Sequence, residues 1–212
     1  MKNWLIGLVC VILVIAGALV YRILSSSDSV QPYVGTELSG EASDFRLTDQ
    51  NGSKINLSDF REKVVVLTFM DSKCKDTCPI TGAHFRKAYQ QLYQNEASQV
   101  VFLSVNVNVE ANAVADILET THAWHMDEIP SWHFLTGSRE DLEPVWKDYD
   151  VAAIPNPDSS ITHTPGTFLI DPSGKKRWYI STTFSTEDSS EPTLPLSELL
   201  IKHIRELLSE NV

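Results

Sequence analysis

The first 24 positions show a pattern of apolar residues unlike that of the remaining chain. Residues 4–21 are almost entirely apolar, with a tryptophan at one end and a tyrosine at the other. About 20 apolar residues let a helix cross the hydrocarbon core of a bilayer, and aromatic side chains favour both interfaces. We therefore expect residues 1–24 to be a transmembrane anchor. A cleaved signal peptide is the alternative, because Ala16-Gly17-Ala18 resembles a small-residue cleavage site.

After this segment, a stretch rich in Ser, Gly and Pro is followed by short apolar runs that alternate with helical periodicity. We expect residues 25–41 to be a flexible tether and residues 42–212 to form one domain. Strands are predicted at 45–49, 54–57, 63–70, 99–105, 132–135, 167–171 and 177–180, and helices at 79–95, 110–121, 138–149 and 196–208. This alternation predicts an α/β fold, a three-layer α/β/α sandwich with a mixed central sheet.

The run at residues 63–70 leads directly into the candidate chemistry. It is nearly all apolar and β-branched, as in a buried central strand, and Cys74 and Cys78 follow it. Pro79 favours the first position of a helix. The two sulfurs should therefore lie where the carboxyl end of a strand meets the amino end of a helix, which is where open α/β sheets bind ligands.

Two cysteines four positions apart can act as a pair only if the chain between them turns. Coiled into a turn, their Cα atoms come to about 6 Å, within the range for a disulfide or for two ligands of one metal ion. Cations at Lys73 and Lys75 should favour the thiolate form, while Asp71 and Asp76 oppose it. A third cysteine, Cys10, lies in the apolar amino-terminal segment.

Composition narrows the classes of function. Lys2 and Arg22 flank the apolar segment, and the remaining chain holds 15 basic and 28 acidic residues. A nucleic-acid binder needs a basic face, so this composition excludes that class. With three cysteines in 212 residues, the chain is not a disulfide-stapled scaffold.

Two thiolates leave a soft metal ion short of ligands, so a third ligand should come from a neighbouring loop. The candidates are the six histidines, His84, His122, His125, His133, His163 and His203. His122 and His125, three apart, could be a metal pair, but a solvated helix end explains them as well. We expect His84 to be a surface or packing residue, His133 a satisfied core histidine, and His203 to face outward on the last helix.

His163 differs from the others by its position. It lies in a Pro- and Ser-rich loop just before the strand 167–171. If that strand neighbours the central one, the loop lies beside the two cysteines. An ordinary loop histidine is the alternative.

Several segments together resemble one family. Cys74-Lys75-Asp76-Thr77-Cys78-Pro79 matches the Cys-x-x-x-Cys-Pro motif of the Sco/SenC proteins, within the thioredoxin-like group. Residues 44–69, 132–151 and 163–174 are similar to the opening, middle and histidine-bearing sections of that family. Two positions depart from the family pattern: Thr162 replaces an acidic residue before the histidine, and Asn106 replaces an aspartate after the second buried strand.

The resemblance implies a thioredoxin-like fold in which Cys74, Cys78 and His163 bind one copper ion, as Cu(I) or Cu(II). It implies a membrane-anchored metallochaperone that assists assembly of the dinuclear copper site of cytochrome c oxidase subunit II. Its domain would lie outside the cytoplasm, in the periplasm or on the outer face of a bacterial cell membrane. The donor set agrees, because two thiolates and one imidazole suit Cu(I).

A second interpretation is a thiol–disulfide oxidoreductase acting on an exported partner. In that case Cys74 and Cys78 would form a redox-active disulfide, with Cys74, the more exposed, attacking and Cys78 resolving. Pro165 stands where thioredoxin-like oxidoreductases carry a cis-proline, and we note it as a candidate for that feature. The sequence leaves open whether the protein is an enzyme.

Overall fold

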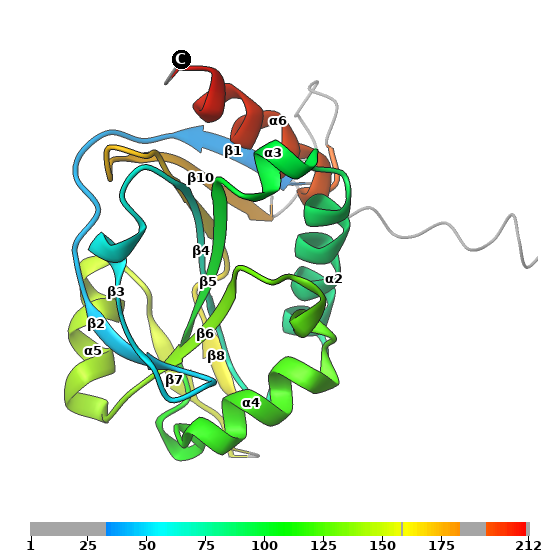
Figure 1. Cartoon of the computed structure of the whole chain (residues 1–212). Helices are drawn as coiled ribbons and strands as arrows, with labels where there is room; N and C mark the ends of the chain where they lie inside the picture. Colours follow the sequence, from blue (N-terminus) through cyan, green and yellow to red (C-terminus); the bar gives the residue numbers. More distant parts are fainter. Residues whose placement is uncertain (1–32, 158, 183–193, 211–212) are drawn as a thin grey trace, which may run out of the picture. The chain divides into compact units, whose positions relative to one another are not determined.

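The computed structural model describes residues 33–157, 159–182 and 194–210, whose core is a mixed eight-stranded sheet (Figure 1). The sheet order is β1-β10-β9-β4-β5-β6-β2-β3, and β7 and β8 form a separate two-stranded sheet. The strands are β1 (Tyr33–Glu37), β2 (Arg46–Asp49), β3 (Lys54–Asn56), β4 (Val64–Met70), β5 (Val100–Asn106), β6 (Trp132–Thr136), β7 (Ala153–Pro155), β8 (Ile161–His163), β9 (Thr167–Ile170) and β10 (Lys176–Thr182). The helices are α2 (Thr77–Gln90), α3 (Gln94–Ala97), α4 (Val114–Ala123), α5 (Arg139–Asp148) and α6 (Leu196–Ser209), with short 3-10 turns η1 (Leu57–Phe60), η2 (Val109–Ala111) and η3 (Met126–Glu128).

Strand β4 is the centre of the sheet, and all seven of its residues are buried. It pairs in parallel with β5 and antiparallel with β9. Successive side chains of a strand point to opposite faces, so Val64 and Val66 join one apolar cluster while Val65 and Leu67 join another. Burial on both faces explains why the β4 sequence is a continuous apolar run rather than an alternating one.

Helices cover both faces of the sheet. The cluster on one face includes residues of α2, α4 and α6, and the cluster on the other includes residues of α5 (Figure 1). Phe85 of α2 is fully buried against Phe102 of β5, with ring centroids 5.6 Å apart. This arrangement confirms the predicted α/β class and the mixed central sheet.

The register of β9 against β4 decides which loops meet at the site. Thr68 lies opposite Thr167 in an antiparallel pair, so the chain that precedes Thr167 lies beside the chain that follows Thr68. The hydroxyl of Thr68 donates to the carbonyl of Gly166 at 2.9 Å. The connection from β8 to β9 is therefore held at the carboxyl end of β4.

Two expectations about the amino-terminal and carboxy-terminal elements were wrong. The predicted tether, residues 25–41, contains β1, which pairs along its whole length with β10. Backbone pairing with a neighbouring strand does not require an apolar pattern, so the polar composition of this segment did not indicate a strand. His203 does not face outward: it is 3% exposed and stacks on Trp178 with ring centroids 3.9 Å apart.

Several element boundaries also differ from the prediction. The helix expected at 79–95 begins two residues earlier, at Thr77, and ends at Gln90. The helix expected at 110–121 divides into η2 and α4, and Leu118 of α4 is 36% exposed. Ser138 caps α5, because its hydroxyl accepts a hydrogen bond from the amide of Asp141. Asn51 and Gly52 lie in the connection between β2 and β3.

The predicted transmembrane segment, residues 1–24, lies outside the described residues. Among the residues that the structure does describe, no helix combines the length and the apolar character that crossing a bilayer requires.

Helix α6 supplies a direct test of this packing. Leu200 is fully buried in the cluster shared with α2 and β4, so Leu200→Ala should lower the free energy of unfolding by about 2–5 kcal/mol. Lys202 on the same helix is exposed, and Lys202→Ala should change it by less than about 0.5 kcal/mol. Chemical denaturation of the two variants checks both values. Equal effects would contradict the assignment of α6 to the core.

Candidate metal centre

The loop after β4 carries both cysteines to the start of α2. The helix begins at Thr77, and the side chain of Asp76 accepts a hydrogen bond from the Thr77 amide at 2.6 Å. Cys78 is therefore the second residue of the helix, with Pro79 third. A helix amino end carries partial positive charge from its unpaired N–H groups, so both sulfurs lie in a region that favours negative charge.

The two cysteines are reduced and in contact through hydrogen bonds. The amide of Cys78 donates to the sulfur of Cys74 at 3.3 Å. Cys74 is half-buried, whereas Cys78 is 3% exposed. Cys74 is thus the more exposed sulfur, as expected for the attacking member of a dithiol pair.

The two thiols have very different affinities for a proton. The thiol of Cys78 donates a hydrogen bond to Cys74, which favours the thiolate of Cys74. This effect is larger than the opposing effect of burial, and the pKa of Cys74 is lowered to about 6. The same hydrogen bond, together with burial, raises the pKa of Cys78. At neutral pH the pair therefore carries one thiolate, on Cys74, and one proton, on Cys78.

The charges next to Cys74 act differently from the expectation. The low pKa of Cys74 comes chiefly from the donors of Cys78, and the ammonium of Lys73 instead pairs with Asp116 at 3.2 Å. The carboxylate of Asp76 lies 3.1 Å from the sulfur of Cys74, and this contact raises the pKa of Cys74. The opposing effect predicted for Asp76 is confirmed.

His163, at the end of β8, reaches the buried sulfur from a distant part of the chain. Its Nε2 atom lies 3.8 Å from the sulfur of Cys78. Its Nδ1 atom lies 3.1 Å from the carbonyl oxygen of Thr164, which can only accept, so Nδ1 carries the proton. The lone pair of Nε2 is consequently free of a proton and directed toward Cys78. Burial lowers the pKa of His163, which keeps the ring neutral.

The separation of these atoms fits a shared metal ion. A metal bonded to sulfur at about 2.3 Å and to nitrogen at about 2.0 Å, with an angle of about 120°, separates the two donors by about 3.7 Å. The Cys78–His163 distance of 3.8 Å matches this value. Within the described ranges no three His, Cys, Asp or Glu side chains already surround a common point. The sulfur of Cys74, which now faces Asp76, would have to turn to complete the set.

The segment after His163 corrects the expectation for Pro165. No peptide bond in the described part of the chain is cis, so Thr164–Pro165 is trans. The next residue, Gly166, has a φ of 152°, which is strained for other residues, and a Cβ there would overlap the ring of Tyr179.

A comparison of the whole sequence with protein families decides the relationship. The family model SCO1/SenC matches residues 35–194, which include both cysteines and His163. The chain belongs to the SCO1/SenC family.

Relatives of this SCO1/SenC chain are distant in sequence. The protein "SCO2 homolog, mitochondrial" of Bos taurus is 29% identical over 157 residues, covering 70% of this chain and 56% of the bovine protein. The crystal structure of Arabidopsis thaliana ScoI with copper bound matches with a TM-score of 0.64 at 22% identity, covering 79% of this chain and 99% of that one. BsSco, a member of the Sco family of cytochrome c oxidase assembly proteins in which a disulfide switch was identified, matches with a TM-score of 0.60 at 21% identity, over 83% and 98% of the two chains. At these identities the structural matches establish the fold.

Two of the other histidines of this SCO1/SenC chain, His133 and His122, face carboxylates. Nδ1 of His133 lies 3.1 Å from the buried carboxylate of Asp49, which confirms a satisfied histidine at that position. His122 and His125 are exposed, and His122 faces Asp127 at 3.7 Å. His84 is half-buried on α2.

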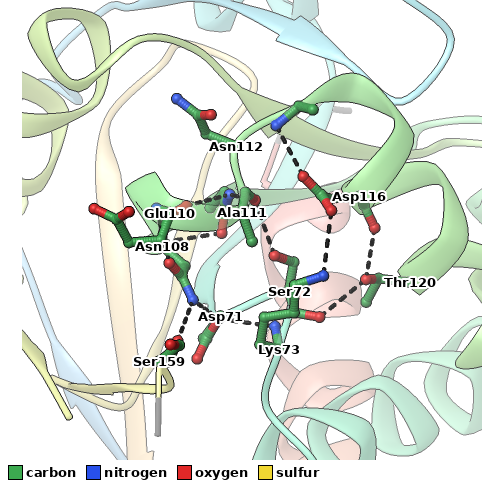
Figure 2. Close-up of polar contacts among 12 residues, drawn as sticks. Asp71, Ser72, Lys73, Asn108, Glu110, Ala111, Asn112, Asp116, Thr120 and Ser159 are labelled. Carbon is green, nitrogen blue, oxygen red and sulfur yellow. Dashed lines mark hydrogen bonds and ion pairs between the residues drawn. The ribbon is translucent and has the colours of Figure 1, made fainter. Parts of the chain in front are cut away.

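Two buried polar residues that the sequence pattern did not reveal support the cysteine loop. Asp71 is fully buried at the end of β4, and Asn108 is fully buried after β5 (Figure 2). The available signal was Asp71, a charged residue directly after a buried strand. Charged residues are rarely buried unless they have partners, so its position indicates a network of polar contacts.

The difference between the two thiols predicts how Cys74 reacts. In the reduced protein, the rate of Cys74 alkylation by iodoacetamide should rise with a midpoint near pH 6, against about 8.5 for an ordinary thiol. Cys78→Ala removes a donor and should raise this midpoint, whereas Asp76→Asn removes an opposing charge and should lower it. Mass spectrometry of the labelled peptide at each pH gives the profile. An ordinary midpoint that neither variant moves would contradict the assignment.

Proposed function

We propose that this SCO1/SenC protein is a membrane-anchored metallochaperone that binds one copper ion through Cys74, Cys78 and His163. The observation that supports the proposal is the approach of Nε2 of His163 to the sulfur of Cys78, 3.8 Å apart although 85 positions separate the two residues. Thiolate sulfur and imidazole nitrogen are ligands that suit Cu(I), and zinc in a structural site would require a fourth protein ligand. Copper-bound structures of family members lend further support.

The protonation states described above fit a carrier rather than a permanent copper site. Cys74 offers a thiolate at neutral pH, and His163 offers a neutral ring whose Nε2 lone pair is available. Cys78 must lose its proton before it can bind the metal, and its raised pKa makes that loss costly. A partner that supplies thiolates can therefore displace Cys78 readily, because a proton returns to it when copper leaves.

The partner we propose is subunit II of cytochrome c oxidase, whose dinuclear copper site would receive the ion. The relationship to BsSco, which belongs to a family of cytochrome c oxidase assembly proteins, supports this choice. The apolar segment at residues 4–21 supports anchoring in a membrane with the copper-binding domain on the extracytoplasmic side.

A second candidate function, thiol–disulfide exchange, is favoured by the low pKa of Cys74. The Cys74 thiolate would attack a partner disulfide, form a mixed disulfide and release one partner thiolate. Cys78, after losing its proton, would attack the sulfur of Cys74 and release the second partner thiol, leaving a Cys74–Cys78 disulfide. The partner gains the two electrons that the cysteine pair loses. His163 is not needed in these steps.

Copper binding by the variants separates the two functions. We expect the reduced full-length protein to bind one Cu(I) under anaerobic conditions, and Cys74→Ser, Cys78→Ser and His163→Ala each to lower the affinity at least tenfold in competition with a chelator. His122→Ala, which alters an exposed histidine, should bind like the original protein. His163→Ala should still exchange disulfides at close to the original rate. Copper affinity indifferent to His163 would favour the second function.

The pH dependence of copper affinity follows from Cys78. Above about pH 7, Cys74 is already a thiolate and His163 is already neutral, so the proton on Cys78 is the one that copper must displace. The apparent Cu(I) affinity should therefore rise about tenfold per pH unit between roughly pH 7 and 9. Competition titrations across this range measure the slope. A flat profile would show that Cys78 is not a ligand.

A further inference from the structure

The hairpin that carries His163 is not part of the main sheet. Strands β7 and β8 pair only with each other among the described residues, outside the eight-stranded order. No ladder of backbone hydrogen bonds therefore fixes His163 relative to β4 and the cysteine loop. The bond from the Thr68 hydroxyl to the Gly166 carbonyl holds the chain after His163. The chain before His163 is held by side-chain hydrogen bonds that meet at one buried carboxylate.

That carboxylate belongs to Asp71, the first residue after β4. It is fully buried, and its two oxygens accept three N–H bonds, each 2.8 Å long. Oδ2 accepts from the amide of Ile161, two residues before His163. Oδ1 accepts from the amide of Lys73, one residue before Cys74. One side chain thus contacts both the segment that carries the sulfurs and the segment that carries the imidazole.

Asn108 strengthens the same link from the loop after β5. Its side-chain nitrogen donates to Oδ1 of Asp71 at 2.8 Å and to the carbonyl of Ser159 at 3.0 Å, as Figure 2 shows. Asn108 is itself held, because its side-chain oxygen accepts from the Glu110 amide at 3.0 Å. The turn of the β7–β8 hairpin is therefore attached at Ser159 through Asn108 and at Ile161 through Asp71.

We propose that Asp71, supported by Asn108, is the positioning residue that holds the His163 imidazole against Cys78, and so sets the metal affinity of the site. This inference rests on the proposed copper function, which it deepens. Asp71 binds no metal itself: its oxygens are already engaged with backbone and amide donors. Residues that orient metal ligands in this way typically change metal affinity 10–100-fold when they are replaced.

The decisive variant is Asp71→Asn in the full-length protein. Asparagine has nearly the same size, but its NH2 group replaces one of the two carboxylate oxygens. A donor would then face an N–H donor that Asp71 accepts from. We expect Cu(I) affinity to fall 10–100-fold. Most of this effect should disappear when His163→Ala is already present, because the bond to Ile161 acts through His163 and only the bond to Lys73 then still matters. Asn108→Ala leaves the Asp71–Ile161 bond intact and should give a smaller loss. An equal further loss from Asp71→Asn in the His163→Ala background would overturn the proposal.

A matched control separates positioning from general destabilisation. The hydroxyl of Thr120 donates to the carbonyl of Ser72 at 3.0 Å, in the same network but without contact to the hairpin (Figure 2). Thr120→Val should lower the unfolding midpoint, as Asp71→Asn does, while leaving Cu(I) affinity unchanged. A matching loss of affinity in Thr120→Val would mean that loosening the network anywhere is sufficient, which would contradict a specific role for Asp71.

A measurement on the copper-free protein makes the inference independent of the proposed function. By NMR, the original protein should show slow hydrogen exchange at the Ile161 amide and a nuclear Overhauser contact between the His163 ring and the Cys78 side chain. Asp71→Asn should lose both. If the original protein binds no copper but Asp71→Asn loses these signals, the function fails and the positioning role stands. If copper binds and Asp71→Asn retains both the signals and the affinity, the positioning role fails.

Discussion

Burial of β4 on both faces is the constraint on which the arrangement of this protein depends. The strand has no solvent-exposed side, so its pairing partners and its register are tightly specified. Its carboxyl end is then a fixed point, at which the cysteine loop begins and at which β9, running antiparallel, starts. The cysteine loop and His163 lie far apart in the sequence. His163 comes close to Cys78 because β4 determines where the cysteine loop begins and where the segment after His163 ends.

The site combines two sulfurs that the fold makes unequal. Cys78, buried in the first turn of α2, donates hydrogen bonds from its thiol and its amide to the half-buried Cys74. This asymmetry is compatible with copper binding and with disulfide exchange, because both start from a ready thiolate at Cys74 and both require Cys78 to lose its proton afterwards. His163 distinguishes the two, since disulfide exchange does not require an imidazole beside the buried sulfur. Asp71 and Asn108, both buried, link the cysteine loop to the hairpin that carries this imidazole.

Much of the fold could be predicted from the sequence, because the patterns that indicate its strands and helices are local. The apolar runs of β4, β5 and β9 and the helix α5 follow from the pattern of apolar and polar residues. The meeting of His163 with the cysteine pair depended on one further assumption, that the strand after His163 neighbours the central strand, and β9 does pair with β4.

The elements that the sequence did not predict are those defined by their partners. Strands β1 and β7 lie in polar or proline-containing segments and exist because another strand pairs with them. His203 is buried because Trp178 stacks on it, which the periodicity of α6 could not indicate. The link from Asp71 to the hairpin could not be predicted, because it depends on how two segments that are 90 positions apart face each other.

The most direct test of the central claim is X-ray absorption at the copper edge of the Cu(I)-loaded full-length protein. Convergence of the three residues predicts one copper ion with two sulfur neighbours and one nitrogen neighbour, and the imidazole scattering should vanish in His163→Ala. A first shell of sulfur alone, unchanged by that substitution, would contradict the account.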